Sequence, residues 1–166
     1  MNNENYIVIN GKKVELTEEQ LKQLGINVEE KKETPFARHS SYWSISAMGM
    51  VEGLHDYNSD FDNAIYDNVN YFNDREFAEQ VALHQLLYRK LLKYAYENDT
   101  IVTDWTDLNS VKYFISKHTG SNKIVVDFNY ELKHSNVVYF TDGRVAKQAI
   151  EDVILPFMVK HPEFVW

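Results

Sequence analysis

The sequence contains no cysteine, 6 glycines and 3 prolines among its 166 residues. The absence of cysteine excludes disulfide bonds, thiolate catalysis and zinc sites with cysteine ligands, and it is compatible with the cytosol. The low glycine and proline content, together with 44% hydrophobic and 14% aromatic residues, argues against a disordered chain. We therefore expect a packed fold, because a chain of this length can bury a substantial core.

The sequence also lacks a membrane-spanning segment and a secretion signal. No apolar run approaches the ~20 residues that a membrane-spanning helix requires, and Met1-Asn2-Asn3-Glu4 lacks the basic and apolar segments of a secretion signal. We expect a soluble, unsecreted protein that does not bind membranes.

The net charge is −8, with 25 acidic residues against 17 Lys and Arg, and the basic residues are not gathered in one stretch. This balance argues against direct binding to nucleic acid, whose phosphates the chain would repel.

One sequence pattern occurs twice. Tyr71-Phe72-Asn73-Asp74 and Tyr139-Phe140-Thr141-Asp142 match at an offset of 68 positions, and the match continues through Ala78 and Ala146 to Gln80 and Gln148. Each copy reads as an extended aromatic pair followed by a helix start. We interpret the copies as two sheet-then-helix repeats, which predicts an α+β fold of antiparallel β-sheets packed against helices.

The boundaries of three parts follow from local signals. Residues 1–34 are predicted to hold a β-hairpin around Asn10-Gly11, a short helix that starts at the Thr17-x-x-Gln20 capping box and ends at Gly25, and a tether that ends before Pro35. Residues 35–100 form the first repeat and residues 101–166 the second.

Within each repeat a hairpin precedes a strand and a capped helix. In the first, residues 42–46 pair with a strand that begins near Met50, and residues 69–72 are extended. In the second, residues 112–116 pair with residues 123–128, and residues 137–140 are extended. Asn73 and Thr141 are the predicted N-caps. The apolar face of the first helix is predicted from Phe77, Val81, His84, Leu87, Tyr88, Leu91, Leu92 and Ala95.

The last helix has an apolar stripe of Val145, Ala149, Val153 and Phe157. Pro156 lacks an amide proton and should kink or stop this helix. The terminal residues Phe164, Val165 and Trp166 leave two readings open, an exposed hook for a partner or a tail that folds back on the body.

The segment from residue 52 to residue 74 is acidic and has no Lys or Arg. We predict an acidic loop there, with a partner-binding surface made of Glu52, Asp56, Asp60, Asp62 and Asp67. The pattern Asp56-x-Asn58-x-Asp60-x-Asp62 is similar to a calcium loop, but Phe61 replaces the glycine of the sharp turn and Asp67 is shorter than the usual bidentate glutamate. We therefore predict no metal and no cofactor.

Catalytic motifs are also lacking. The six histidines have no spacing that would place two metal ligands on one helix face, and we interpret His84 as a core histidine. No nucleophile elbow, phosphate-binding loop or dinucleotide fingerprint is present. The aromatic residues that head the two hairpins favour core packing over base stacking, because basic residues do not accompany them: Tyr42, Trp43, Tyr113 and Phe114. We predict that the protein is not an enzyme.

Most of residues 35–166 resemble small proteins of phages and prophages of Gram-positive gut bacteria. The segments that carry the resemblance are Tyr71-Phe72-Asn73-Asp74-Arg75-Glu76-Phe77-Ala78-Glu79-Gln80-Val81-Ala82, Val138-Tyr139-Phe140-Thr141-Asp142 and His161-Pro162-Glu163-Phe164. Such phage proteins include anti-CRISPR and other anti-defence inhibitors. The resemblance implies no catalytic residue, since its motifs are capping and packing residues.

Three functional hypotheses follow. The leading one is a non-enzymatic phage protein of the host bacterial cytoplasm that binds and inhibits a bacterial defence protein through its acidic surface, with a type II CRISPR effector as the first target. An alternative is a binder that sequesters a nucleotide immune signal in a pocket between the two repeats or between protomers, using Trp43 or Trp105. A third is a virion structural or assembly protein. A homodimer is left open.

Overall fold

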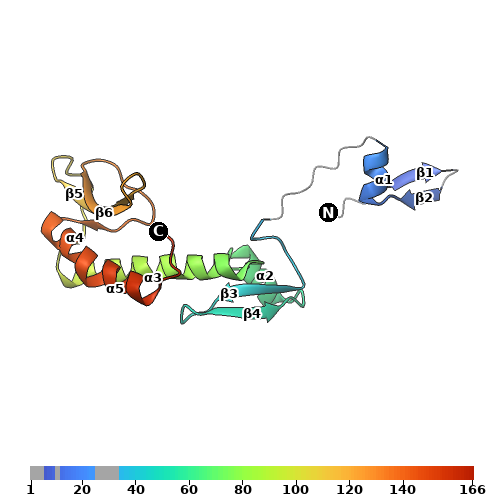
Figure 1. Ribbon diagram of the computed structural model, residues 1–166, viewed down its shortest axis with the longest axis horizontal. Coiled ribbons are helices and arrows are strands. Elements are labelled where there is room, and N and C mark those ends of the chain that lie inside the picture. The colour runs from blue at the N-terminus through green and yellow to red at the C-terminus, as the bar shows by residue number, and fades with distance from the viewer. Residues whose placement is uncertain (1–5, 10–11, 25–33) are drawn as a thin grey trace. The chain divides into compact units, whose positions relative to one another are not determined.

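The computed structural model describes residues 6–9, 12–24 and 34–166, and its helices and antiparallel sheets give the α+β fold that the sequence predicts. The chain consists of two compact units, Met1–Thr34 and Pro35–Trp166. Figure 1 labels most of their helices and strands. No helix in the described part of the chain is long and apolar enough to cross a membrane.

The first unit contains the predicted hairpin and helix. Strands β1 (Tyr6–Ile9) and β2 (Lys12–Glu15) pair antiparallel and precede α1 (Glu18–Gln23). The Thr17 amide donates to Gln20 Oε1 at 2.9 Å and the Gln20 amide donates to Thr17 Oγ1 at 3.3 Å, which confirms the capping box. The predicted turn and helix-end residues Asn10, Gly11 and Gly25, and residues 28–33 of the predicted tether, lie outside the described residues.

The second unit begins with a hairpin and two helices. Its elements are β3 (Ser41–Ile45), β4 (Val51–His55), α2 (Asp60–Asp67) and the long α3 (Arg75–Glu97). The prediction of a loop over residues 52–74 is therefore wrong, because β4 and α2 occupy much of this segment. Helix α2 forms because Ser59 caps it, and Ser59 and Asp62 bond reciprocally in a capping box that carries Asp where Glu or Gln is usual.

The remaining elements follow the same order, without a counterpart of α2. They are β5 (Lys112–His118), β6 (Lys123–Asn129), β7 (Tyr139–Phe140), α4 (Gly143–Ala149), the π-helix η1 (Ile150–Ile154) and α5 (Leu155–Lys160). In both repeats an aromatic segment pairs antiparallel with the first strand of the hairpin. Trp43 and Phe72 exchange two backbone hydrogen bonds of 2.7 and 2.9 Å, and Tyr113 pairs with Phe140.

Both helix caps lie one residue later than predicted. Asp74 Oδ1 accepts from the Phe77 amide at 3.0 Å, and Asp142 Oδ1 accepts from the Arg144 amide at 2.7 Å. The predicted caps Asn73 and Thr141 still belong to the extended segments. Their amides donate to the carbonyl oxygens of Pro35 and Thr100, respectively, at 2.8 and 2.7 Å. The start of each helix is thus set by the residue that follows the last extended one.

Helix α3 packs against both repeats. It contacts β3 and β4, and it also packs on α4 and η1. Figure 1 shows α4 beside it. The buried stripe is shifted from the predicted one and contains Ala78, Ala82, Leu83, Leu87, Leu91 and Ala95. His84 is exposed, so its interpretation as a core histidine is wrong. Small residues at 78 and 82 permit close packing of the helix.

The main hydrophobic core lies between α3 and the second repeat. It joins leucines of α3 to Phe140 of β7, Ala146 and Ala149 of α4, and Ile154 of η1. Of the two predicted effects of Pro156, a stop is wrong, because the chain stays helical from η1 into α5 and widens to a π turn just before the proline. A kink stays a prediction. The Leu155 amide donates to the Ile150 carbonyl in η1, and the chain continues as α5. A π turn accommodates a residue that cannot donate to the carbonyl four positions earlier.

The C-terminal residues fold back on α3. Gln80 Nε2 donates to the Glu163 carbonyl oxygen at 2.8 Å, and Gln80 Oε1 accepts from the Val165 amide at 2.9 Å. Phe164 is buried in the core next to this clamp. Of the two readings of the tail, the structure has the folded one.

Gly143 lies close to the ring of Tyr113, and this contact leaves no room for a side chain. A Cβ atom at Gly143 would lie 2.8 Å from Cε1 of the half-buried Tyr113 ring. The matching position of the first repeat is Arg75, whose guanidinium lies 5.2 Å from the centre of the Trp43 ring. The second repeat thus needs a residue without a side chain where the first repeat has a long one.

We predict that Gly143→Ala destabilises the protein by about 1–3 kcal/mol, because the methyl group overpacks Tyr113 and outweighs the higher helix propensity of alanine. The matched control is Gly120→Ala, where a Cβ meets no atom within 4 Å. Its effect should stay within about 0.5 kcal/mol. Urea unfolding of both variants measures the difference, and equal midpoints would show that the Tyr113 contact is not tight.

Candidate functional site

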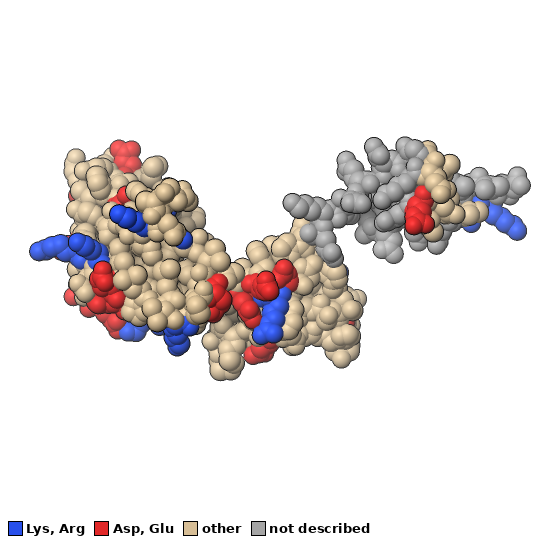
Figure 2. Space-filling model, in the orientation of Figure 1, with Lys and Arg blue, Asp and Glu red and all other residues tan. Residues whose placement is uncertain are grey.

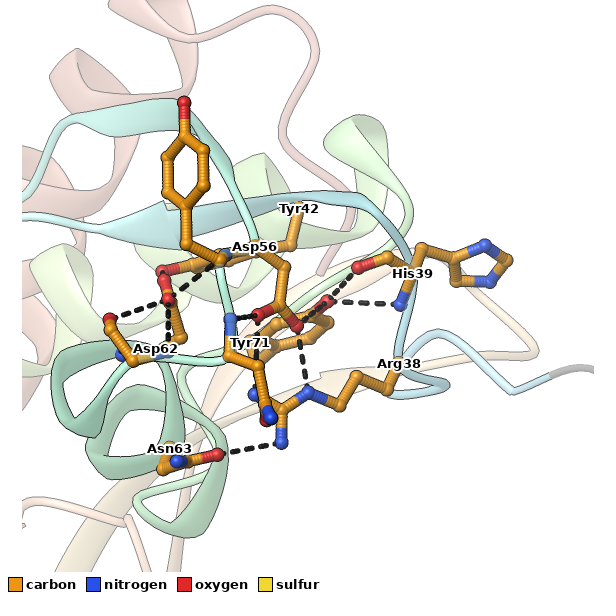
Figure 3. A network of polar contacts seen from close by, with 10 residues as sticks. Arg38, His39, Tyr42, Asp56, Asp62, Asn63 and Tyr71 are labelled. Carbon is orange, nitrogen blue, oxygen red and sulfur yellow. Dashed lines mark hydrogen bonds and ion pairs between the residues drawn. The ribbon is translucent and has the colours of Figure 1, made fainter. Parts of the chain in front are cut away.

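A network of polar side chains lies between β3, β4, α2 and the segment before α3 (Figure 3). Its centre is the Asp62 carboxylate, which is only 3% exposed. Asp62 Oδ1 accepts from the Tyr42 hydroxyl at 2.8 Å. Asp62 Oδ2 accepts from the amides of Tyr57 and Ser59 at 3.1 and 3.0 Å and from the Ser59 hydroxyl at 2.6 Å. These four bonds compensate for the burial of the charge.

Asp56 forms the second half of the network. Its Oδ2 accepts from Arg38 Nε at 2.7 Å, and its Oδ1 accepts from the Asn58 amide at 2.7 Å and from Arg38 Nη2 at 3.2 Å. The Tyr71 hydroxyl accepts from the His39 amide at 2.9 Å. It lies 2.6 Å from the His39 carbonyl oxygen and 3.1 Å from Asp56 Oδ2, either of which can accept its single proton. The fork of Arg38 thus bridges both carboxylate oxygens.

The tyrosines join the two halves. The rings of Tyr42 and Tyr71 stack with their centres 4.1 Å apart, and both side chains are 1% exposed. Tyr66 of α2 packs edge-on against Tyr71 and under the Arg38 guanidinium. The network therefore connects β3, the end of β4, α2 and the segment before α3.

The electrostatics keep both carboxylates charged. Bonds from Arg38 lower the pKa of Asp56 to about 2, and the Ser59 hydroxyl is the main cause of the lowered pKa of Asp62. Burial, with the neighbouring Asp62 carboxylate, raises the pKa of Tyr42. A carboxylate with so low a pKa is a weak general base at neutral pH. The two carboxylates accept hydrogen bonds from the amides of residues 57, 58 and 59, and these bonds hold the backbone of residues 56–59 in place.

Two aromatic side chains, one in this loop and one in the first turn of α2, are exposed to solvent. Tyr57 is 79% exposed and Phe61 is 61% exposed, although both are aromatic. The His55 ring lies 5.0 Å from the Tyr57 ring. Rigid loops that present aromatic side chains are typical of binding surfaces.

The five predicted partner-binding residues do not form one surface. The carboxylates of Asp56 and Asp62 are used inside the fold, whereas Asp60 and Asp67 are exposed on α2 and Glu52 is exposed on β4. The face of residues 35–166 visible in Figure 2 carries acidic and basic side chains next to one another, without a continuous acidic area. Among the described residues no group of three or more acidic or histidine side chains could hold a metal ion.

Four members of this network are not among the predicted site residues: Arg38, Ser59, Tyr42 and Tyr71. Ser59-x-x-Asp62 was a usable signal, because it is a capping box with a shorter acid. The contact between Arg38 and Asp56 has no sequence signal, because the antiparallel pairing of β3 and β4 is what brings these two residues together.

We predict that Tyr42→Phe lowers the free energy of unfolding by about 1–3 kcal/mol, because Asp62 Oδ1 loses its donor and no water replaces it in the interior. Tyr57→Phe is the matched control, since the exposed Tyr57 hydroxyl lies in water, and its effect should stay within about 0.5 kcal/mol. Urea unfolding at pH 7 compares the two. Equal stabilities would mean that the buried hydroxyl bond contributes nothing.

A second prediction concerns pH. The pKa of Asp56 is lower in the folded than in the unfolded chain, so this contribution to stability is complete above about pH 4 and is lost as the pH falls toward about 2. Asp56→Asn should therefore have a lower urea midpoint than the wild type at pH 6, and the gap should narrow below about pH 3. Asp60→Asn controls for the loss of one charge. A gap for Asp56→Asn that stays constant from pH 6 to pH 2.5 would contradict the prediction.

No protein-family model matches the chain, and no curated protein or solved structure is significantly similar to it.

Proposed function

We propose that this protein works by binding a protein partner through the α2 face, which we define as Tyr57, Asp60, Phe61, Ala64 and Asp67. The observation that carries the proposal is the difference between the repeats. Residues 130–138, all of them described, connect β6 to β7 without a helix, whereas the first repeat has α2 at this place. Because the second repeat forms its strand and capped helix without such an insertion, a strand-then-helix repeat does not by itself require a helix at this place. The inner side of α2 supplies Asp62 and Tyr66 to the polar network, and its outer side is free to serve another role.

The exposed side of α2 has the composition of a binding surface. Asp60, Phe61, Ala64 and Asp67 follow helical spacing and are all exposed. Exposed aromatic side chains are unfavourable in water unless a partner covers them, and they are the usual anchors of protein interfaces. The polar network on the inner side holds Tyr57 and the first turn of α2 in place, which reduces the entropy that binding would cost.

The charges on the α2 face indicate a basic partner. Among the described residues Asp60 and Asp67 have no cation within 4.0 Å, so their charges are available to a partner. Aromatic rings between carboxylates suit arginine side chains, which bind carboxylates through ion pairs and rings through cation–π contacts. Binding of this kind depends on salt concentration and is steered by the net charge of −8.

The resemblance to phage proteins supports a narrower proposal. The partner is a bacterial defence protein in the host cytoplasm, and binding to its basic, nucleic-acid-holding surface inhibits it. A type II CRISPR effector is the first target to test. The protein acts by occupancy and not by catalysis, in keeping with carboxylates whose low pKa makes them poor bases.

The test compares the wild type with an α2-face variant that combines Asp60→Asn, Phe61→Ser and Asp67→Asn. We expect the variant to bind and inhibit the effector at least about tenfold more weakly, because one aromatic anchor and two charges are lost. Binding isotherms and target-cleavage assays measure both effects. Affinity capture from host lysate with the same pair of proteins covers other defence partners.

The matched control removes two charges elsewhere, by Glu131→Gln and Glu151→Gln. Both side chains are exposed and lie outside α2. This control should keep the binding of the wild type apart from a weaker salt dependence. Capture of the same proteins by the wild type and the α2-face variant would contradict a role for this face, and lack of inhibition of the effector would contradict only that target.

A further inference from the structure

Two adjoining cavities lie between α3 and the second repeat, on residues other than those of the α2 face. Their volumes are about 220 and 530 Å³, and His84, Tyr88 and Asn136 line both of them. We call the pair the α3 groove. The larger volume is within the roughly 300–1,000 Å³ that is usual for small-molecule sites.

The inner cavity has an apolar floor. Leu87 and Leu91 of α3, Phe140 of β7 and the tail residue Phe164 line it, and all four belong to the hydrophobic core. Tyr88 and Trp166 add half-buried aromatic rings at its sides. A flat apolar ring placed here would be removed from water and could stack on an aromatic side chain. Neither Trp43 nor Trp105, the aromatic residues expected for a ligand pocket, lines either cavity.

The outer cavity has a positively charged residue in its lining. It is lined by Gln85 and Arg89 besides the shared residues, and no Asp or Glu lines either cavity, although the chain has 25 acidic residues. Arg89 has no carboxylate partner within 4.0 Å among the residues that the structure describes. An unpaired guanidinium at the mouth of an apolar cavity complements a phosphate group, which it can bind with two hydrogen bonds.

We propose that the α3 groove binds a nucleotide, with the base over the apolar floor and the phosphate at Arg89. Gln85, His84 and Asn136 supply hydrogen-bonding groups between these two ends, where a nucleotide carries its ribose. The proposal goes beyond the α2 face and is independent of it, since the two surfaces share no residue. The groove joins α3, from the first repeat, to the second repeat, so occupancy would also stabilise the contact between the repeats.

The experiment uses the full chain and a panel of probes, namely the four ribonucleoside 5′-monophosphates and a 3′,5′-cyclic dinucleotide. Adenosine and inorganic phosphate serve as the two half-ligands, and benzoate serves as a ring with a carboxylate. We expect at least one nucleotide to bind saturably in calorimetric titration and to raise the melting temperature. Each half-ligand should bind at least about tenfold more weakly, because it reaches only one end of the groove.

The decisive variant is Arg89→Gln, which should weaken nucleotide binding at least about tenfold through loss of the charge-assisted hydrogen bonds. Its matched control is Lys90→Gln, an equal charge change at the next position of α3 on a residue that lines neither cavity. Trp166→Leu tests the ring contact. The proposal is overturned if no nucleotide in the panel binds, if phosphate or benzoate binds as tightly as the best nucleotide, or if Arg89→Gln and Lys90→Gln have equal effects.

Discussion

Helix α3 is the element on which the rest of residues 35–166 depends, because both repeats bury the same helix. Its 23 residues span about 35 Å. It packs on β3 and β4, and its leucines enter the core of the second repeat. A repeat taken alone would expose the part of α3 that the other covers, which explains why the two repeats form a single compact unit.

The two repeats fill their interiors in different ways. The second has an aliphatic and aromatic core around Phe140 and Ile154. The first places a tyrosine stack and the charged Asp62 at the equivalent depth. Burial of a carboxylate is tolerated only when its oxygens accept hydrogen bonds, and each donor must then hold one position. The first repeat thereby obtains a loop of fixed geometry, which an apolar core would not specify.

Local signals predicted much of the fold but little of the candidate site. Hairpins, capping boxes and the repeat at Tyr71 and Tyr139 depend on neighbours in sequence, so strands and helices fell near their expected places. The role of each acid depends instead on tertiary contacts. Asp60 and Asp62 are two positions apart on α2, yet one faces water and the other Tyr42. The exposure of His84 likewise depends on which side of α3 the second repeat covers.

Some residues recur at matching positions of the two repeats, and packing accounts for them. They are the capping aspartates Asp74 and Asp142, the buried Ala78 and Ala146, and the paired Phe72 and Phe140. Packing does not account for the exposed rings of Tyr57 and Phe61 on the α2 face, nor for an unpaired Arg89 at the mouth of an apolar cavity. Exposed aromatic groups and unpaired charges contribute little to the stability of a monomer, and the binding that we propose for the α2 face and the α3 groove would account for them.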